Sequence, residues 1–426
     1  MIDTEAIAEV AYDMARRNFS HVFGYPETGF KEKPVWQRLR TLGTRLWLDT
    51  GDIDEAKTLW CSEFEALTTN NTLLNQEIQK GAYDDFVREI AASLRHAADI
   101  DERRLVLEIA FVLNAYHGLR LAAMFDAHVS VELHTDLGND VEGSVAYGKR
   151  YFDICPQRFY VKVPLTPAGL LAARRLGHDG VPVNLTLGFS ARQDYLAALL
   201  AQPRFVNVFM GRLNAFVADN ALGDGRNVGE KTTLAAQREL LGLRRAGRTR
   251  SLLIGASMRE GAQVPALAGL DVFTMPTKVA SQYEAKPAAQ LSSRVRNDLP
   301  IHLAEPVALS DFNATTLWDV PEAFKDAVDE LLSQNVDALG PEDLQAHFAR
   351  AGFADVLPSW SDEDVRTTAA DGKIPVFDTW KDRLARGEIG LDALMNLSAF
   401  QSFATDQKAL DDRIRSLIQA VYPARP

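Results

Sequence analysis

Short runs of apolar and β-branched residues recur between residues 45 and 276, and residues that typically start helices follow several of them. Each run has the length of one buried strand, and the longer segments between the runs carry apolar residues at helical spacing. The pattern predicts eight strands, at residues 45–51, 64–69, 128–133, 159–164, 181–189, 205–212, 251–257 and 271–276.

Eight strands that alternate with helices over about 230 residues predict parallel βαβ units and fit a closed (β/α)₈ barrel. An open doubly wound sheet is the competing architecture, but no strand runs into a G-x-G-x-x-G turn. The glycines from Gly223 to Gly229 have a different spacing and follow no apolar strand, so we interpret them as a loop. The expected fold class is therefore α/β, a TIM barrel with helical additions at both ends.

Outside the barrel the apolar spacing is helical. Residues 1–40 are expected to form an N-terminal helical extension, which becomes irregular from Tyr25 to Gly29. Residues 41–310 would form the catalytic barrel, and residues 311–426 a C-terminal helical region packed on it. Within the C-terminal region, residues 354–376 are interpreted as an irregular insertion, and the amphipathic run 391–421 as a final helix that covers the barrel.

Composition and charge narrow the class of protein. With 46% hydrophobic and 24% charged residues the chain is typical of a globular protein, and its net charge of −12 argues against nucleic acid as a partner. Two cysteines, Cys61 and Cys155, provide neither a disulfide framework nor a cysteine zinc site. His134 and Asp136 have a metal-like spacing without a third ligand, so we interpret them as a solvated loop.

We expect no membrane segment and a cytoplasmic location. The first residues are acidic, whereas a signal peptide has a basic start and an apolar run. No apolar stretch approaches the roughly 20 residues that span a bilayer.

Four of the expected strands are followed by a residue that can cap a helix. These are Asp52, Thr166, Ser190 and Ser257. The helix after Ser257 would carry Arg259 in its first turn, and free N–H groups at a helix N-terminus attract anions. With Arg212 at the end of the sixth strand, this segment predicts a phosphate site.

Polar residues stand at the carboxyl ends of the expected strands, where the side chains of a barrel converge on one mouth. They are Asp49, Asn70, Glu132, Lys162, Asn184, Thr186, Arg212, Ser257 and Arg259. Polar residues are costly in apolar strands unless a site uses them. The sequence therefore predicts a polar active site at this mouth.

Lys162 indicates the kind of chemistry. Desolvation inside a barrel favours the neutral amine of a lysine, which can attack a ketone and form an imine. The imine withdraws electrons, so that the C3–C4 bond of a ketose can break without a cofactor or a metal. The reaction also needs acid/base groups and amides for hydroxyls, and the other strand ends carry such residues: Asp49, Glu132, Thr186, Asn70 and Asn184.

Each residue also has a purely structural explanation. A lone strand lysine is more often a charge at the barrel rim, Asp49 could cap the following turn, and Asn70 could satisfy a loop. Glu132 and Arg212 could form a structural ion pair. These explanations are plausible one at a time, but hard to sustain together at successive strand ends.

Seven short motifs, in order, resemble those of the transaldolase family. They are residues 49–53 (DTGDI), 67–70 (LTTN), 129–132 (VSVE), 162–164 (KVP), 184–187 (NLTL), 209–212 (FMGR) and 255–259 (GASMR). Residues 403–410 (FATDQKAL) are similar to the C-terminal helix of the family. The resemblance covers roughly residues 41–280 and the last few dozen. It implies reversible transfer of a dihydroxyacetone unit from a ketose phosphate to an aldose phosphate, in the pentose phosphate pathway.

The resemblance also implies a role for each site residue. Lys162 would form the Schiff base, Asp49 would be the acid/base at the C4 hydroxyl, and Glu132 would act through a water molecule held by Thr186. The residues implied in substrate binding are Asn70 and Asn184 for dihydroxyacetone, Arg212, Ser257 and Arg259 for phosphate, and Phe209. The phenylalanine at position 209, with Glu132, favours the transferase over the related fructose-6-phosphate aldolases, which have a tyrosine there.

Two sites depart from the family pattern near the mouth: Asn71 stands where a proline is usual, and Asn207-Val208 where Ser-Pro is usual. The length of the chain and these departures leave open a related aldolase or transferase that acts on another phosphosugar. A hypothesis of a different class is a non-catalytic barrel that binds sugar phosphates. The expected partners are small sugar phosphates, and the chain is expected to be a monomer or a homodimer.

Overall fold

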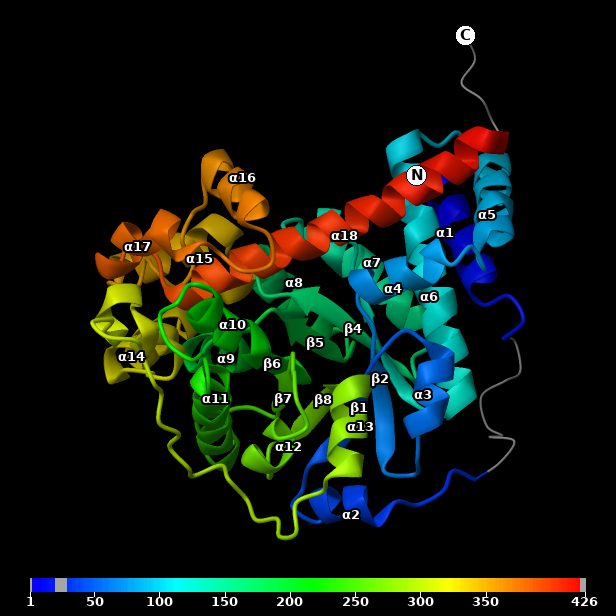
Figure 1. Cartoon of the computed structure of the whole chain (residues 1–426). Coiled ribbons are helices and arrows are strands. Elements are labelled where there is room, and N and C mark those ends of the chain that lie inside the picture. Colours follow the sequence, from blue (N-terminus) through cyan, green and yellow to red (C-terminus); the bar gives the residue numbers. More distant parts are fainter. Residues whose placement is uncertain (1, 20–28, 422–426) are drawn as a thin grey trace.

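The computed structural model describes residues 2–19 and 29–421, and its centre is a closed barrel of eight parallel strands (Figure 1). Each strand pairs with the next in sequence, and the last pairs with the first. The strands are β1 (Arg45–Asp49), β2 (Phe64–Thr68), β3 (His128–Glu132), β4 (Phe159–Pro164), β5 (Val183–Thr186), β6 (Phe205–Phe209), β7 (Leu252–Ala256) and β8 (Val272–Pro276). The predicted (β/α)₈ barrel is confirmed.

Strand register decides which polar residues meet at the mouth. Asp49 pairs with Thr68 on β2, and Glu132 on β3 pairs with Lys162 on β4. Lys162 in turn pairs with Asn184 on β5. Because parallel strands bring their carboxyl ends to the same edge, these side chains lie at neighbouring positions of one rim.

Helices surround the barrel and extend the chain at both ends. The barrel helices are α2 (Pro34–Arg40), α3 (Ile53–Leu59), α4 (Asn71–Gln79), α5 (Asp84–Ala97), α6 (Glu102–Phe125), α7 (Val141–Ile154), α8 (Pro167–His178), α9 (Ala191–Leu200), α10 (Met210–Asp219), α11 (Val228–Arg245), α12 (Gln263–Ala266) and α13 (Thr277–Ala285). The expected caps at Asp52, Thr166 and Ser190 all accept main-chain N–H groups of the helices that follow them.

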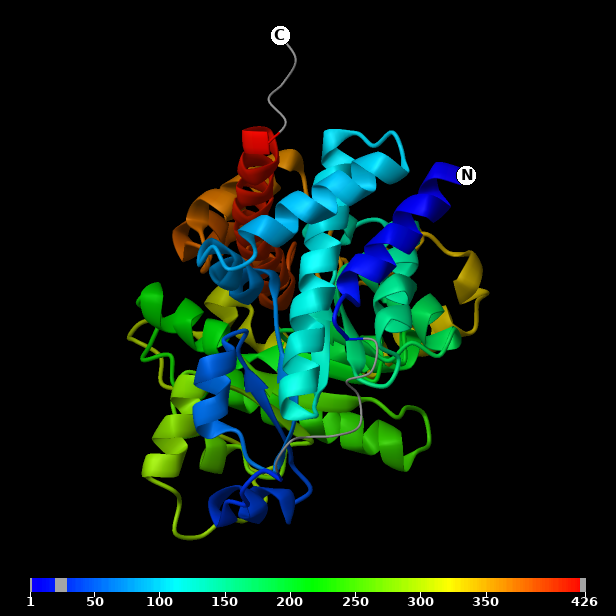
Figure 2. The same cartoon turned by 90° about the vertical axis from the view of Figure 1, so that its right-hand side faces the viewer.

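Helix α1 (Ile2–Ala15) lies in the predicted N-terminal extension and packs against α5 and α6 (Figure 2), and α2 falls within the same predicted range. The irregular stretch predicted from Tyr25 lies, up to residue 28, outside the described residues. The division of the chain at residues 40 and 310 stays a prediction.

Helix α6 corrects the expectation that no apolar stretch approaches the length needed to span a bilayer. Among the described residues it is the one helix whose length and apolar composition would allow it to cross a membrane. In the fold, however, 83% of its apolar window is buried inside the protein, and its Glu108 pairs with Arg150 of α7. These are the surroundings of a core helix.

The C-terminal region contains α14 (Glu322–Leu332), α15 (Pro341–Arg350), α16 (Asp362–Asp371), α17 (Phe377–Ala385) and α18 (Leu391–Val421). The expectation that residues 354–376 are irregular is therefore wrong for the part that forms α16. Ser361 and Asp364 cap this helix reciprocally: the Ser361 hydroxyl accepts the Asp364 N–H, and the Asp364 carboxylate accepts the Ser361 N–H. This reciprocal arrangement, a capping box, satisfies free N–H groups at the start of a short, polar helix.

Helix α18 crosses above the mouth of the barrel (Figure 1). Asn396 donates hydrogen bonds to the carbonyl oxygens of Leu165 (2.9 Å) and Leu187 (2.7 Å), which follow β4 and β5. Farther along, Asp411 lies 3.2 Å from the ring of His134. His134 is therefore buried beneath the helix, and its interpretation as part of a solvated loop is wrong.

Candidate active site

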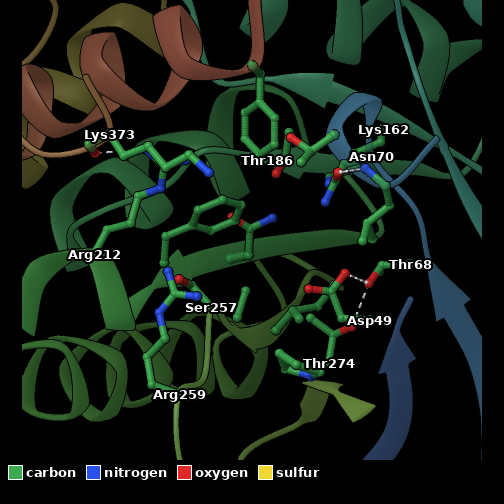
Figure 3. A pocket seen from close by; sticks show the side chains of 18 of the residues that line it. Asp49, Thr68, Asn70, Lys162, Thr186, Arg212, Ser257, Arg259, Thr274 and Lys373 are labelled. Atoms are coloured by element: carbon green, nitrogen blue, oxygen red, sulfur yellow. Dashed lines mark hydrogen bonds between the residues drawn. The ribbon is translucent and has the colours of Figure 1, made fainter. Parts of the chain in front are cut away.

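Lys162 lies in a pocket of about 340 Å³ at the carboxyl ends of the strands (Figure 3). The residue is only 4% exposed, and its Nζ is 3.6 Å from Oε1 of Glu132 and 3.4 Å from the carbonyl oxygen of Thr69. Nine of the ten residues predicted from the sequence line this pocket, and the tenth, Glu132, forms the ion pair with Lys162. The structure thus brings all ten together.

Glu132 is held from two sides. Its Oε1 faces Lys162, while its Oε2 accepts the main-chain N–H of Asn71 at 3.0 Å. Burial raises the pKa of the Glu132 carboxyl, and the positive charge of Lys162 and the Asn71 N–H oppose that shift. A carboxyl with a raised pKa next to an amine is suited to exchange a proton with it. The structural ion pair considered for Glu132 and Arg212 is not formed.

Asp49 lies across the pocket from Arg212 and Arg259 (Figure 3). Its Oδ1 accepts a hydrogen bond of 2.7 Å from the hydroxyl of Thr68, which also lies 2.7 Å from the hydroxyl of Thr274. Burial raises the pKa of the Asp49 carboxyl, while Lys162 and the Thr68 hydroxyl lower it. The Asp49 carboxyl is therefore oriented by a short chain of hydroxyl groups.

The amides and Thr186 complete the polar wall. Asn70 caps α4 through its Oδ1, so the structural role considered for it is real, yet it also lines the pocket. Asn184 donates to the hydroxyl of Ser130 at 3.0 Å and accepts from Asn207 at 3.4 Å. The hydroxyl of Thr186 is buried without a hydrogen-bond partner among the described residues, which leaves it free for a water molecule or a substrate.

Two arginines lie at the other end of the pocket. Arg212 is 8% exposed, and burial together with the nearby charge of Arg259 lowers its pKa to about 10. Within the described ranges neither guanidinium forms an ion pair with a carboxylate, although Arg212 donates to the carbonyl oxygen of Lys373 at 3.0 Å. Arg259 is exposed, but the two guanidinium groups lie close together, and two such cations with no carboxylate partner among the described residues are a ready anion site.

The chain around the arginines differs from the prediction. Strand β6 ends at Phe209, so Arg212 lies in the first turn of α10 and not on the strand. A Cβ on Gly211 would lie 2.1 Å from the carbonyl oxygen of Ser257, so only glycine allows this close approach. The approach brings the two arginines to one end of the pocket.

The predicted helix start at Ser257 is wrong. Ser257 has a φ of +60°, a left-handed turn conformation, and the next helix, α12, begins only at Gln263. The N–H groups of Arg259 and Glu260 donate to Oε1 of Gln263 and are not free for an anion. An anion here would depend on the guanidinium groups and the Ser257 side chain, not on a helix terminus.

Two aromatic side chains, Phe209 and Phe403, form part of the pocket lining. Phe403 of α18 places its ring centre 5.9 Å from Nζ of Lys162 and 5.6 Å from the guanidinium of Arg212. The ring of Phe209 lies 6.5 Å from that of Phe403. The polar residues therefore face a cavity with an apolar cover, which favours desolvated chemistry.

The sequence prediction did not include several residues of the pocket. Thr68 and Thr274 could have been found, because they too are polar residues at or near the ends of apolar strands. Lys373 and Ile374 gave no local signal, since a distant segment brings them to the mouth. The described residues contain no group of three or more His, Cys, Asp and Glu that could hold a metal ion.

The chain is similar to known proteins over nearly the whole barrel. A family model described as transaldolase/fructose-6-phosphate aldolase matches residues 46–337. A transaldolase of Xanthomonas oryzae is 30% identical over 246 residues, which cover 56% of this chain and 74% of the relative.

Two further relatives are matched over most of their length. A transaldolase of Xanthomonas campestris is 28% identical over 321 residues, which cover 72% of this chain and 94% of the relative. A probable transaldolase of Roseiflexus castenholzii is 31% identical over 251 residues, 58% of this chain and 92% of the relative. Since the family model spans more than half of the 426 residues, the chain belongs to the transaldolase/fructose-6-phosphate aldolase family and is an enzyme.

Proposed function

We propose that this enzyme is a transaldolase, which transfers dihydroxyacetone from a ketose phosphate to an aldose phosphate through a Schiff base on Lys162. The observation that carries the proposal is one pocket with two chemically distinct ends. A buried lysine between two carboxyls stands at one end, and two arginines with no carboxylate partner in the described part of the chain stand at the other. A keto group and a phosphate of one sugar match these ends.

The reaction begins with the amine. Transfer of a proton from Lys162 to Glu132 leaves a neutral nitrogen, which attacks the C2 carbonyl carbon of the ketose and forms a carbinolamine. Glu132 then returns a proton to the carbinolamine oxygen through a water molecule held by Thr186, and this oxygen leaves as water. The product is an iminium between Lys162 and the sugar.

Asp49 acts in the next step. Its carboxylate takes the proton of the C4 hydroxyl, the C3–C4 bond breaks, and the electron pair of that bond moves into the iminium as an enamine. The aldose phosphate leaves, while the three-carbon unit stays on Lys162. An acceptor aldose phosphate reverses these steps, and hydrolysis of the new iminium releases the product.

The arginines would recognise the phosphate of donor and acceptor. We expect Arg212→Met and Arg259→Met each to lower kcat/KM for fructose 6-phosphate by roughly 10- to 100-fold, because each removes charge-assisted hydrogen bonds. Steady-state kinetics with fructose 6-phosphate and with unphosphorylated fructose would measure the effect. An equal loss for both sugars would contradict phosphate recognition. The control is Arg226→Met, because Arg226 is an exposed arginine in the loop of residues 220–227.

Transfer is favoured over simple cleavage by the apolar cover. The rings of Phe209 and Phe403 line the pocket beside Lys162, and a Lys162 enamine that meets little water can persist until an acceptor arrives. Sedoheptulose 7-phosphate or fructose 6-phosphate would donate, and glyceraldehyde 3-phosphate or erythrose 4-phosphate would accept. These are reactions of the pentose phosphate pathway, which takes place in the cytoplasm.

Coupled assays with and without an acceptor test the proposal. With fructose 6-phosphate and erythrose 4-phosphate we expect sedoheptulose 7-phosphate, and without an acceptor little free dihydroxyacetone. Release of dihydroxyacetone at the same rate with or without acceptor would make the chain an aldolase. Binding of sugar phosphates without any conversion, seen by calorimetry, would instead support the non-catalytic barrel.

A further inference from the structure

Asn71 contacts the Glu132 carboxylate through its main chain. Asn71 is the first residue of α4 and is 2% exposed. Its main-chain N–H donates to Oε2 of Glu132 at 3.0 Å, and its side-chain amide donates to the carbonyl oxygen of Leu133 at 3.3 Å. The start of α4 is thus attached to the end of β3 at the residue next to the reacting lysine.

We infer that Asn71 is a positioning residue, whose main-chain N–H orients the Glu132 carboxylate toward Lys162 and stabilises its ionised form. The inference rests on the proposed role of Glu132 in the Schiff-base reaction. With Oε2 held by the Asn71 N–H, the other oxygen, Oε1, is the one that faces the Lys162 ammonium at 3.6 Å. A carboxylate fixed at one oxygen presents the other in a single orientation.

The position of Asn71 makes this donor available. The first residue of a helix has an N–H group with no partner inside the helix. A proline, which is usual here in the family that the sequence resembles, would fit the helix start equally well but has no N–H to donate. The asparagine therefore adds a hydrogen-bond donor to the carboxyl without a cost in helix geometry.

The other groups around Glu132 set the direction of the effect. Lys162 on β4 stabilises the carboxylate, and Asp49 on β1 and burial destabilise it. From α6, the neutral amide of Asn114 reaches only the main-chain oxygen of Glu132. On α18, Asp406 accepts a hydrogen bond from Thr72, and Asp411 accepts one from His134, two residues after Glu132. Removal of the Asn71 N–H should therefore favour the protonated carboxyl.

The test compares Asn71→Pro with Asn71→Ala. Both variants lose the side-chain amide, but only the proline variant loses the N–H group. Imine formation with fructose 6-phosphate, trapped by borohydride and followed by intact mass, is measured against pH. Imine formation should fall at low pH as Glu132 becomes protonated, and we call this part of the profile the acid limb. We expect the acid limb of the proline variant to lie about one pH unit above that of the alanine variant, because loss of a hydrogen bond to the charged Glu132 carboxylate raises its pKa by about that much.

Other outcomes would overturn the inference. Equal acid limbs in the two variants would mean that the N–H group does not act on Glu132, and a shift already complete in Asn71→Ala would assign the effect to the side chain. If the unmutated chain formed no imine at any pH, the proposed function would fail, which is a separate result.

A second measurement needs no proline variant. With ¹⁵N-labelled asparagine, the Asn71 main-chain N–H resonance should move with the acid limb in the unmutated enzyme. It should lose this pH response in Glu132→Ala. A resonance that keeps the same response in Glu132→Ala would also overturn the inference.

Discussion

Replacement of Lys162 by methionine is expected to abolish turnover, with a loss of at least roughly 10⁴-fold in kcat, because the nucleophile that forms the imine is gone. Methionine is similar in length and fills the same apolar surroundings without an amine, so the barrel should keep its packing. After incubation with fructose 6-phosphate and borohydride, the unmutated enzyme should gain the mass of a reduced three-carbon unit, and the variant should gain none.

The matched control is Lys149→Met. Lys149 is a half-exposed lysine of α7 that pairs with Asp179 and does not line the pocket. This variant should form the adduct as the unmutated enzyme does. An adduct of undiminished yield in Lys162→Met would show that another lysine is the nucleophile, and the assignment of Lys162 would have to be withdrawn.

Replacement of Asp49 by asparagine should separate imine formation from cleavage of the sugar. We expect turnover to fall by roughly 10²- to 10⁴-fold, because the amide cannot take the proton of the C4 hydroxyl. Lys162 and Glu132 remain, so the imine should still form. Asparagine has the shape of aspartate and can still accept the hydrogen bond of Thr68, which limits the structural consequences.

The trapped species is the sharper readout for Asp49→Asn. Without cleavage the imine keeps the whole donor, so borohydride should yield an adduct of six carbons that retains its phosphate. A three-carbon adduct formed at the normal rate would show that another group is the base. Asp54→Asn, an exposed aspartate of α3, is expected to behave as the unmutated enzyme.

Local patterns explain why so much of the barrel could be predicted. The strands are buried along their length, so each appears in the sequence as an apolar run of its own. Caps such as Asp52, Thr166 and Ser190 act within three residues and are therefore written in the sequence. Parallel order then brings the polar strand ends to one mouth, so Asp49, Glu132 and Lys162 could be placed together before any contact was known.

The failures at Ser257 and His134 have a different cause. Ser257 has the sequence of a capping box, but the close contact between Gly211 and the Ser257 carbonyl accompanies a left-handed turn in place of a helix start. His134 is polar and follows a strand, yet α18 buries it through Asp411, which is 277 residues away in sequence. Neither contact can be read from neighbouring residues.

The sequence by itself thus determined the barrel and the order of its polar strand ends, because periodicity and capping depend on interactions between near neighbours. Only the tertiary structure decided how these groups are held. It placed Phe403 over Lys162, the Lys373 carbonyl on Arg212 and the Asn71 N–H on Glu132. These contacts join segments that are far apart in sequence, or depend on the direction of one main-chain N–H, and packing of the complete chain fixes both.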